Sequence, residues 1–202
     1  MSTSTRYAIV GSGRIGTSLA RLFSRAGIEA GIANTRGPES LRDLAAALGS
    51  PIHPVSMTDA LSSDVIFLAV PFPAVEQVGS LLPSWTGKTV VDATNAHYAA
   101  GADDVLKGRA SAHYTAEKFP GAAVVKAFNQ LPADVLAANL DPGIGKRVVF
   151  IATDVPEAGD RIAELAGELG LGAVQVGAID KGGRLIEVPG PLVLRNLVER
   201  PL

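Results

Sequence analysis

Three glycines near the start of the chain have the spacing of a loop that binds a diphosphate. They form the pattern G-x-G-x-x-G between a strand-like apolar run and a helical pattern. Its glycines permit a tight turn, close approach of the backbone to a pyrophosphate, and packing of the helix on the strand. A glycine-rich turn without a ligand is the simpler alternative, but the flanking strand and helix favour a dinucleotide. The residues expected to bind it are Gly11, Ser12, Gly13, Arg14, Ile15 and Gly16.

The residues after the second expected strand indicate which dinucleotide is bound. NAD-binding domains normally carry Asp or Glu about 20 residues past the glycine motif, where it binds the ribose 2′-hydroxyl. This chain has Asn34-Thr-Arg-Gly-Pro38 there, without a carboxylate. The hydroxyl of Thr35 and the guanidinium of Arg36 would instead pair with a 2′-phosphate. We therefore predict NADP(H), although a solvated surface cation is the simpler reading of Arg36. The residues expected to bind it are Asn34, Thr35, Arg36 and Ser40.

Three later strand ends supply candidates for the nicotinamide end of the cofactor. Ala69-Val-Pro-Phe-Pro73 forms either a stiff wall suited to a flat ring or an ordinary strand-ending turn. After the next strand, Asn95 would bond the carboxamide or ribose. Lys126-Ala-Phe-Asn129 follows another strand, and its lysine is either buried against a carboxylate or a surface charge. From these ends we expect cofactor contacts by Ala69, Val70, Pro71, Asn95 and Asn129.

None of these strand ends carries an obvious acid–base pair. His97 and His113 lie in an irregular stretch, where a structural or surface role is the better interpretation. Hydride transfer between two ring cofactors needs alignment and exclusion of water but no obligatory protein acid or base. A carbonyl reductase would need a proton donor such as Tyr, Lys or His. We therefore expect no catalytic side chain, and a ring-type electron acceptor.

Strand-like and helical segments alternate along the chain, which predicts an α/β fold with a mostly parallel sheet. The expected strands are 7–10, 29–34, 52–55, 65–70, 89–92, 122–127, 147–153 and 173–176. The expected helices are 14–26, 39–48, a short one opened by the capping box 56–59, 74–82, 133–139 and 156–169, with 93–120 irregular. A Rossmann-like, doubly wound sheet binds its ligand beyond the carboxyl ends of its strands.

Composition excludes several other functions. The 202 residues carry 18 basic and 20 acidic side chains, and a formal net charge of −2 argues against a nucleic-acid partner. Without Cys, disulfides, thiol catalysis and Cys-ligated metals are excluded, and three scattered His predict no metal site. The longest apolar run, 65–70, is far below the ~18 residues of a membrane helix. With no secretory signal either, we expect a soluble cytoplasmic protein without a membrane partner.

Several of these segments, taken in order, resemble the NADP oxidoreductases that depend on the deazaflavin coenzyme F420. The matching pieces are Gly11-Ser-Gly-Arg-Ile-Gly16, Asn34-Thr-Arg-Gly-Pro38, Phe67-Leu-Ala-Val-Pro71, Asp92-Ala-Thr-Asn95, Val125-Lys-Ala-Phe-Asn129 and Gly190-Pro-Leu192. The resemblance implies a single Rossmann domain over 1–202, in which 178–202 is a small segment on the substrate side. It also implies NADPH on the glycine loop and hydride exchange in a cleft lined by Pro71, Asn95 and Ala127. Two features depart from the family: Ala96 follows Asn95 where Pro is usual, and the tail after Leu192 is short.

Three functions follow from these observations. The first is an NADPH-dependent reductase whose acceptor is a deazaflavin or a flavin. The second is a reductase of a small carbonyl or imine, with His97, Tyr98 or Lys126 as proton donor. The third is a nucleotide-binding module without turnover. An open sheet edge and the apolar tail also favour a homodimer.

Overall fold

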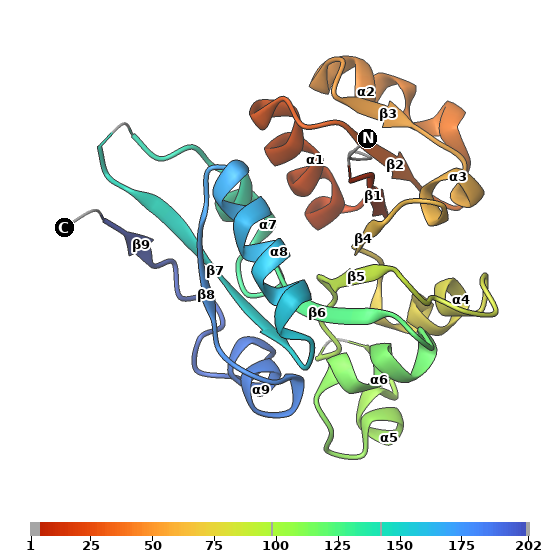
Figure 1. Ribbon diagram of the computed structural model, residues 1–202, viewed down its shortest axis with the longest axis vertical. Helices are drawn as coiled ribbons and strands as arrows, with labels where there is room; N and C mark the ends of the chain where they lie inside the picture. The colour runs from red at the N-terminus through yellow and green to blue at the C-terminus, as the bar shows by residue number, and fades with distance from the viewer. Residues whose placement is uncertain (1–4, 98, 142, 201–202) are drawn as a thin grey trace.

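The computed structural model describes residues 5–97, 99–141 and 143–200 as one twisted sheet with helices on both faces (Figure 1). The strands are β1 (Tyr7–Val10), β2 (Ala30–Ala33), β3 (Ile52–Pro54), β4 (Val65–Leu68), β5 (Thr89–Asp92), β6 (Ala123–Ala127), β7 (Lys146–Thr153), β8 (Gly172–Gln175) and β9 (Val198–Glu199). The α-helices are α1 (Arg14–Ala26), α2 (Arg42–Leu48), α3 (Met57–Leu61), α4 (Val75–Gly79), α5 (Ala102–Leu106), α6 (Ser111–Lys118), α7 (Ala133–Ala137), α8 (Pro156–Glu168) and α9 (Arg184–Ile186). None of the described helices combines the length and apolar composition that a membrane crossing needs.

The strand order confirms the expected Rossmann-like, doubly wound fold. Neighbouring strands run β3-β2-β1-β4-β5-β6-β7-β8, and all pairs from β3 to β6 are parallel. The chain reverses its direction of winding between β1 and β4, which leaves a crevice beyond their carboxyl ends. β7 is antiparallel to β6, and β8 returns parallel to β7 after α8. The sheet is therefore mostly parallel, as predicted.

Apolar side chains cover both faces of the sheet. On the face of α1, α7 and α8, the rings of Phe23, Phe67 and Phe128 follow one another at centroid distances of 5.4 and 5.6 Å. On the face of α4 and α6, Trp85 packs on Phe119 at 4.5 Å, and its Nε1 donates to Gly79 O at 2.9 Å. The strands between these two layers are mostly apolar, because neither face meets water.

α7 lies along α1 and is tied to it near both ends. Ser18 Oγ donates to Ala133 O at 2.8 Å, and Arg25 Nη1 donates to Ala137 O at 2.6 Å. The arginine supplies a donor to a carbonyl that has no partner within its own helix. The segment that follows β6 is thus attached to the helix that follows the glycine turn.

The last part of the chain folds back on the sheet. A π-helical turn (Ile179–Gly183) precedes α9, and β9 pairs antiparallel with the start of β7. Ile186 O accepts a hydrogen bond from Asn129 Nδ2 at 2.8 Å, and Leu194 N donates to Gln130 O at 2.8 Å. The tail therefore completes the hydrogen bonding of the loop after β6.

The predicted and observed elements differ mainly where contacts between residues far apart in the sequence determine the secondary structure. The stretch 93–120, expected to be irregular, contains α5 and α6. The first turn of α6 is capped by Glu187, whose Oε2 accepts from Ser111 N at 2.8 Å across 76 positions. A local pattern does not reveal such a cap. The expected helices 39–48 and 74–82 each begin as a 3₁₀ turn, Pro38–Leu41 and Phe72–Ala74.

Two glycine substitutions should change the free energy of unfolding in opposite directions. A Cβ on Gly16 would overlap the carbonyl oxygen of Gly11, so Gly16→Ala should destabilise the protein by about 1–3 kcal/mol. Gly167 lies within α8 with no atom near its missing Cβ, so Gly167→Ala should stabilise by about 0.5–1 kcal/mol. Urea unfolding curves of the two variants test this contrast. Equal effects would contradict close packing at Gly16.

Candidate functional site

A cleft of about 720 Å³ opens at the carboxyl ends of β1, β2 and β4. It lies where the sheet changes its direction of winding, and α3 and α4, which lie on the right of Figure 1, also contribute lining residues. Its lining residues are Val10, Gly11, Ser12, Gly13, Asn34, Thr35, Arg36, Gly37, Pro38, Ser56, Met57, Ala69, Val70, Pro71, Ala74, Gln77, Val78 and Leu81. Nine of the residues predicted from the sequence are among them.

The glycine turn forms one wall of this cleft. Gly11 has a φ of 111°, and a Cβ there would overlap the Ala69 carbonyl oxygen on β4's continuation. Gly13 has no atom within 4 Å of the position that a Cβ would take, so its backbone is open to the cleft. α1 then begins without a side-chain cap and without an acidic residue in its first turn. Its first N–H groups are therefore available to an anion.

The turn after β2 forms a second wall and carries the charge. Arg36 is exposed, lines the cleft, and pairs with no carboxylate in the part of the chain that the structure describes. No Asp or Glu is among the lining residues. The cleft thus holds a single formal charge, a guanidinium, which favours an anionic ligand.

Four lining residues from α4 and its flanks were missed by sequence reasoning. Ala74, Gln77, Val78 and Leu81 have the spacing of one helix face, and Leu81 is 48% exposed. This spacing of three and four residues, after the buried strand β4, is the sequence pattern from which these lining residues could have been predicted. With Met57 they give this part of the cleft its apolar surface.

A contact with α6 holds α4 in place. Glu76 accepts hydrogen bonds from Lys118 Nζ at 2.5 Å and from Tyr114 Oη at 3.0 Å. The bond from Lys118 is the main reason that the pKa of Glu76 lies below its ordinary value. These bonds orient the helix face that lines the cleft.

Four other predicted residues do not line the cleft. Arg14 Nη2 points to Asp134 at 2.8 Å, an exposed pair between α1 and α7. Ile15 packs against the core, and Gly16 contacts the glycine turn. Ser40 Oγ donates to Gly37 O at 2.8 Å and so closes the turn after β2.

The residues predicted for the nicotinamide end form a second group. Asn95 Nδ2 donates to Asn129 O at 2.8 Å, and Asn129 Nδ2 donates to Asn95 Oδ1 at 3.1 Å. Ala127 is fully buried beside them on β6. The structure brings Asn95 and Asn129 together, but it does not join them to Pro71 in one cavity.

Lys126 is a buried structural cation. Its Nζ lies 3.3 Å from Asp92 Oδ1, and neither side chain is exposed. Nζ also donates to Thr94 O at 2.6 Å, while Thr115 Oγ1 donates to Asp92 Oδ2 at 2.8 Å. Asp92 and Lys126 are register partners on β5 and β6. Of the two sequence interpretations of Lys126, burial against a carboxylate is the one observed.

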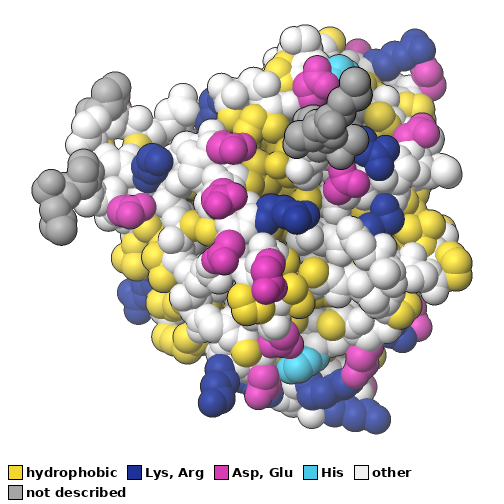
Figure 2. All heavy atoms as spheres, viewed as in Figure 1, with side chains coloured by type: hydrophobic (Ala, Val, Ile, Leu, Met, Phe, Trp, Pro, Cys, Tyr) yellow, Lys and Arg dark blue, Asp and Glu magenta, His cyan; other side chains and the backbone are white. Residues whose placement is uncertain are grey.

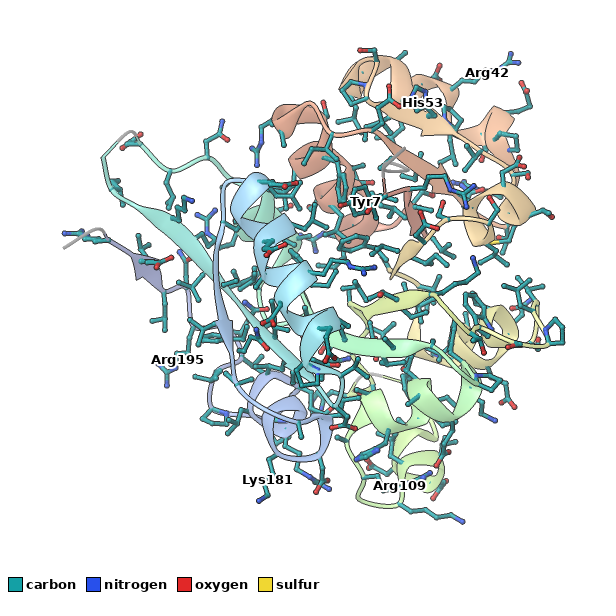
Figure 3. All side chains as sticks on the ribbon, viewed as in Figure 1. Tyr7, Arg42, His53, Arg109, Lys181 and Arg195 are labelled. Atoms are coloured by element: carbon teal, nitrogen blue, oxygen red, sulfur yellow. The ribbon has the colours of Figure 1, made fainter. Side chains whose placement is uncertain are left out.

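The histidines lie away from the cleft. His53 is exposed on the edge strand β3 (Figure 3). His113 Nε2 is 3.7 Å from Asp180 Oδ1, and His97 lines a separate pocket with Asp103 and Glu187. Tyr98 lies outside the described residues.

The fold, the open glycine turn and the cationic second turn define a dinucleotide-binding domain of the Rossmann class. Residues 6–96 match the model of a family described as NADP oxidoreductase, coenzyme F420-dependent. Over these residues the chain matches a family of NADP-dependent oxidoreductases, and the resemblance seen in the sequence is thereby confirmed.

Three individual proteins are similar to the chain in sequence or in fold. A solved structure of a hypothetical protein from Sinorhizobium meliloti is 42% identical, with a TM-score of 0.91 over 97% of this chain and 96% of that one. A proposed F420-dependent NADP reductase from Arthrobacter sp. FB24 shares the fold, at 21% identity and a TM-score of 0.71 over 87% and 86% of the two chains. The metalloreductase STEAP3 of Rattus norvegicus is 29% identical over 185 residues, which are 91% of this chain. The chain spans only 36% of that protein's length.

Replacing Lys126 should destabilise the fold strongly. Lys126→Met leaves the buried carboxylate of Asp92 without its cation, and we expect a loss of about 3–5 kcal/mol in the free energy of unfolding. The double change Lys126→Met with Asp92→Asn should recover part of this loss. Arg42→Met breaks an exposed pair with Glu39 and should cost less than about 1 kcal/mol. Urea unfolding measures all three, and equal costs for Lys126→Met and Arg42→Met would contradict a buried ion pair.

Proposed function

We propose that this chain binds NADPH in the cleft and transfers its hydride to a ring-type acceptor, a deazaflavin or a flavin. The observation that carries the proposal is the composition of the cleft. An open glycine turn and Arg36 share one cavity whose lining contains no carboxylate. The match of residues 6–96 to a family of NADP oxidoreductases supports the same cofactor.

The lining residues fit the parts of the nucleotide. The backbone at Gly11, Ser12 and Gly13 would bind the diphosphate, since Gly13 leaves the space that a Cβ would fill. Thr35 and Arg36 would bind the 2′-phosphate by charge-assisted hydrogen bonds. The apolar surface of Met57, Val70 and Leu81 suits a flat adenine ring.

The nicotinamide end would lie beyond Pro71, towards Asn95, Ala127 and Asn129. Bound NADPH supplies a hydride, and the chain's task is to align the two rings and exclude water. Two neutral amides bonded to each other offer no proton. Lys126 is buried and paired with Asp92, so it is not available as a donor. The absence of a proton donor in this group supports an acceptor that needs no proton from the protein. The segment 178–202 would lie on the acceptor's side of the cleft.

A surface patch supports the expected homodimer. Figure 2 shows apolar side chains gathered at the lower left, where β8, β9 and α9 lie in Figure 1. Among the exposed residues of this part of the chain are Val174 (45% exposed), Leu194 (68%) and Leu197 (48%). A second copy would cover this edge of the sheet.

Arg36→Ala should weaken NADPH binding by about 1.5–3 kcal/mol and leave NADH binding nearly unchanged, because only NADPH carries the 2′-phosphate. Fluorescence titration of both nucleotides measures the two dissociation constants. Arg42→Ala is the matched control, since that arginine is paired with Glu39 outside the cleft lining. Equal losses for both nucleotides would show that Arg36 does not recognise the phosphate.

An acceptor assay tests the reaction itself. With NADPH and purified protein, coenzyme F420 or a flavin should lose its oxidised absorbance as NADPH is consumed in equal amount. A small carbonyl or imine is the comparison substrate. Turnover of the comparison substrate alone would replace the proposed acceptor class, and tight NADPH binding without any oxidation would indicate a binding module.

A further inference from the structure

The side chain of Asn34 joins the two turns that form the cleft. Its Nδ2 donates to Ser12 Oγ at 2.9 Å, on the glycine turn, and to Ser40 Oγ at 3.1 Å. Its Oδ1 accepts from the backbone N–H of Arg36 at 2.9 Å. Thr35 and Arg36 are exposed, and the other hydrogen bonds of their turn, from Gly37 N to Asn34 O and from Ser40 to Gly37 O, are made within the turn itself.

The bonds leave the amide little capacity for a ligand. A primary amide has two N–H donors, and both are engaged with serine hydroxyls. The amide oxygen accepts from the Arg36 N–H, and the hydroxyl of Ser40 lies 3.2 Å from it. The sequence predicted Asn34 as a cofactor contact, whereas its observed bonds fit a residue that positions other contacts.

The place of Asn34 in the fold also bears on specificity. It directly follows β2, where NAD-binding domains carry the carboxylate that binds the ribose 2′-hydroxyl. Asn has the shape of Asp without the charge. A carboxylate here would still accept from Arg36 N–H and from the hydroxyl of Ser12, which can rotate to donate. The fold would therefore tolerate Asp, but the cleft would gain a negative charge beside Arg36.

We infer that Asn34 is a positioning and specificity-determining residue: its amide orders both turns, and its neutrality admits a 2′-phosphate. The inference rests on the proposed function for its second half only. Asn34 holds Arg36 in the cleft by accepting from its backbone N–H, and it holds the glycine turn by donating to Ser12 Oγ. The chemical class it selects is an adenosine nucleotide with a phosphorylated 2′ position.

The decisive comparison is Asn34→Asp against Asn34→Ala. Asn34→Asp should weaken NADPH binding by at least about tenfold through like-charge repulsion and leave NADH binding within about threefold. Asn34→Ala should weaken both nucleotides, because it releases the glycine turn that binds the shared diphosphate. Ser40→Ala, which removes one partner of the amide, should have a smaller effect than either. Dissociation constants for both nucleotides, measured on all four proteins, give the pattern.

A measurement without nucleotide tests the positioning role independently. Hydrogen exchange of the backbone amides at 35–40 should be faster in Asn34→Ala than in the wild type, and little changed in Asn34→Asp. Unchanged exchange in Asn34→Ala would overturn the positioning role. An unchanged ratio of NADPH to NADH affinity in Asn34→Asp would overturn the specificity role. If the wild type bound neither nucleotide, the proposed function and the specificity role would both fail, while the exchange result would still decide the positioning role.

Discussion

The contact between the first turn of α1 and the turn after β1 determines the geometry of the cleft. Gly16 lies so close to the carbonyl of Gly11 that no side chain fits between them, and Gly11 lies equally close to the carbonyl of Ala69. Three backbone segments are therefore stacked without intervening side chains. The N-terminus of α1, the end of β1 and the end of β4 meet at a fixed separation, and every other wall of the cleft is built around that junction.

Two cations of the molecule, Lys126 and Arg36, differ in burial and in pairing. The buried cation Lys126 is neutralised by Asp92 and by the carbonyl of Thr94, so it ties β5 to β6 without adding a net charge near the site. Arg36, at the cleft, is exposed and has no acidic partner among the described residues. The fold thus pairs the buried Lys126 with a carboxylate and leaves Arg36, which faces the cleft, without one, which is the arrangement expected for recognition of a phosphate.

Much of the fold follows from local patterns in the sequence. β1, α1 and β5 have the predicted bounds, because each is marked by its apolar spacing and by glycines or turn residues at its ends. The mostly parallel sheet follows from the alternation of strands and helices, and the glycine turn follows from its motif. These features depend on neighbours within a few positions of each other.

The features that sequence reasoning missed or left open depend on distant neighbours. The start of α6 is capped by Glu187, far along the chain, and Lys126 finds Asp92 only through the register of β5 and β6. The role of Asn34 depends on Ser12, a residue of another turn. A spacing rule identifies which residues gather at strand ends, but it does not tell which of them contact a ligand and which contact each other.

The tail has a consequence for how the molecule can be dissected. Asn129 and Gln130, which follow β6, exchange hydrogen bonds with Ile186 and Leu194 of the last segment. Ile186 is itself fully buried. A truncated chain ending at residue 177 would therefore lose the hydrogen-bond partners of the loop after β6. It would also expose the apolar surface that Ile186 covers. Residues 178–200 are therefore an integral part of the architecture and not a detachable module.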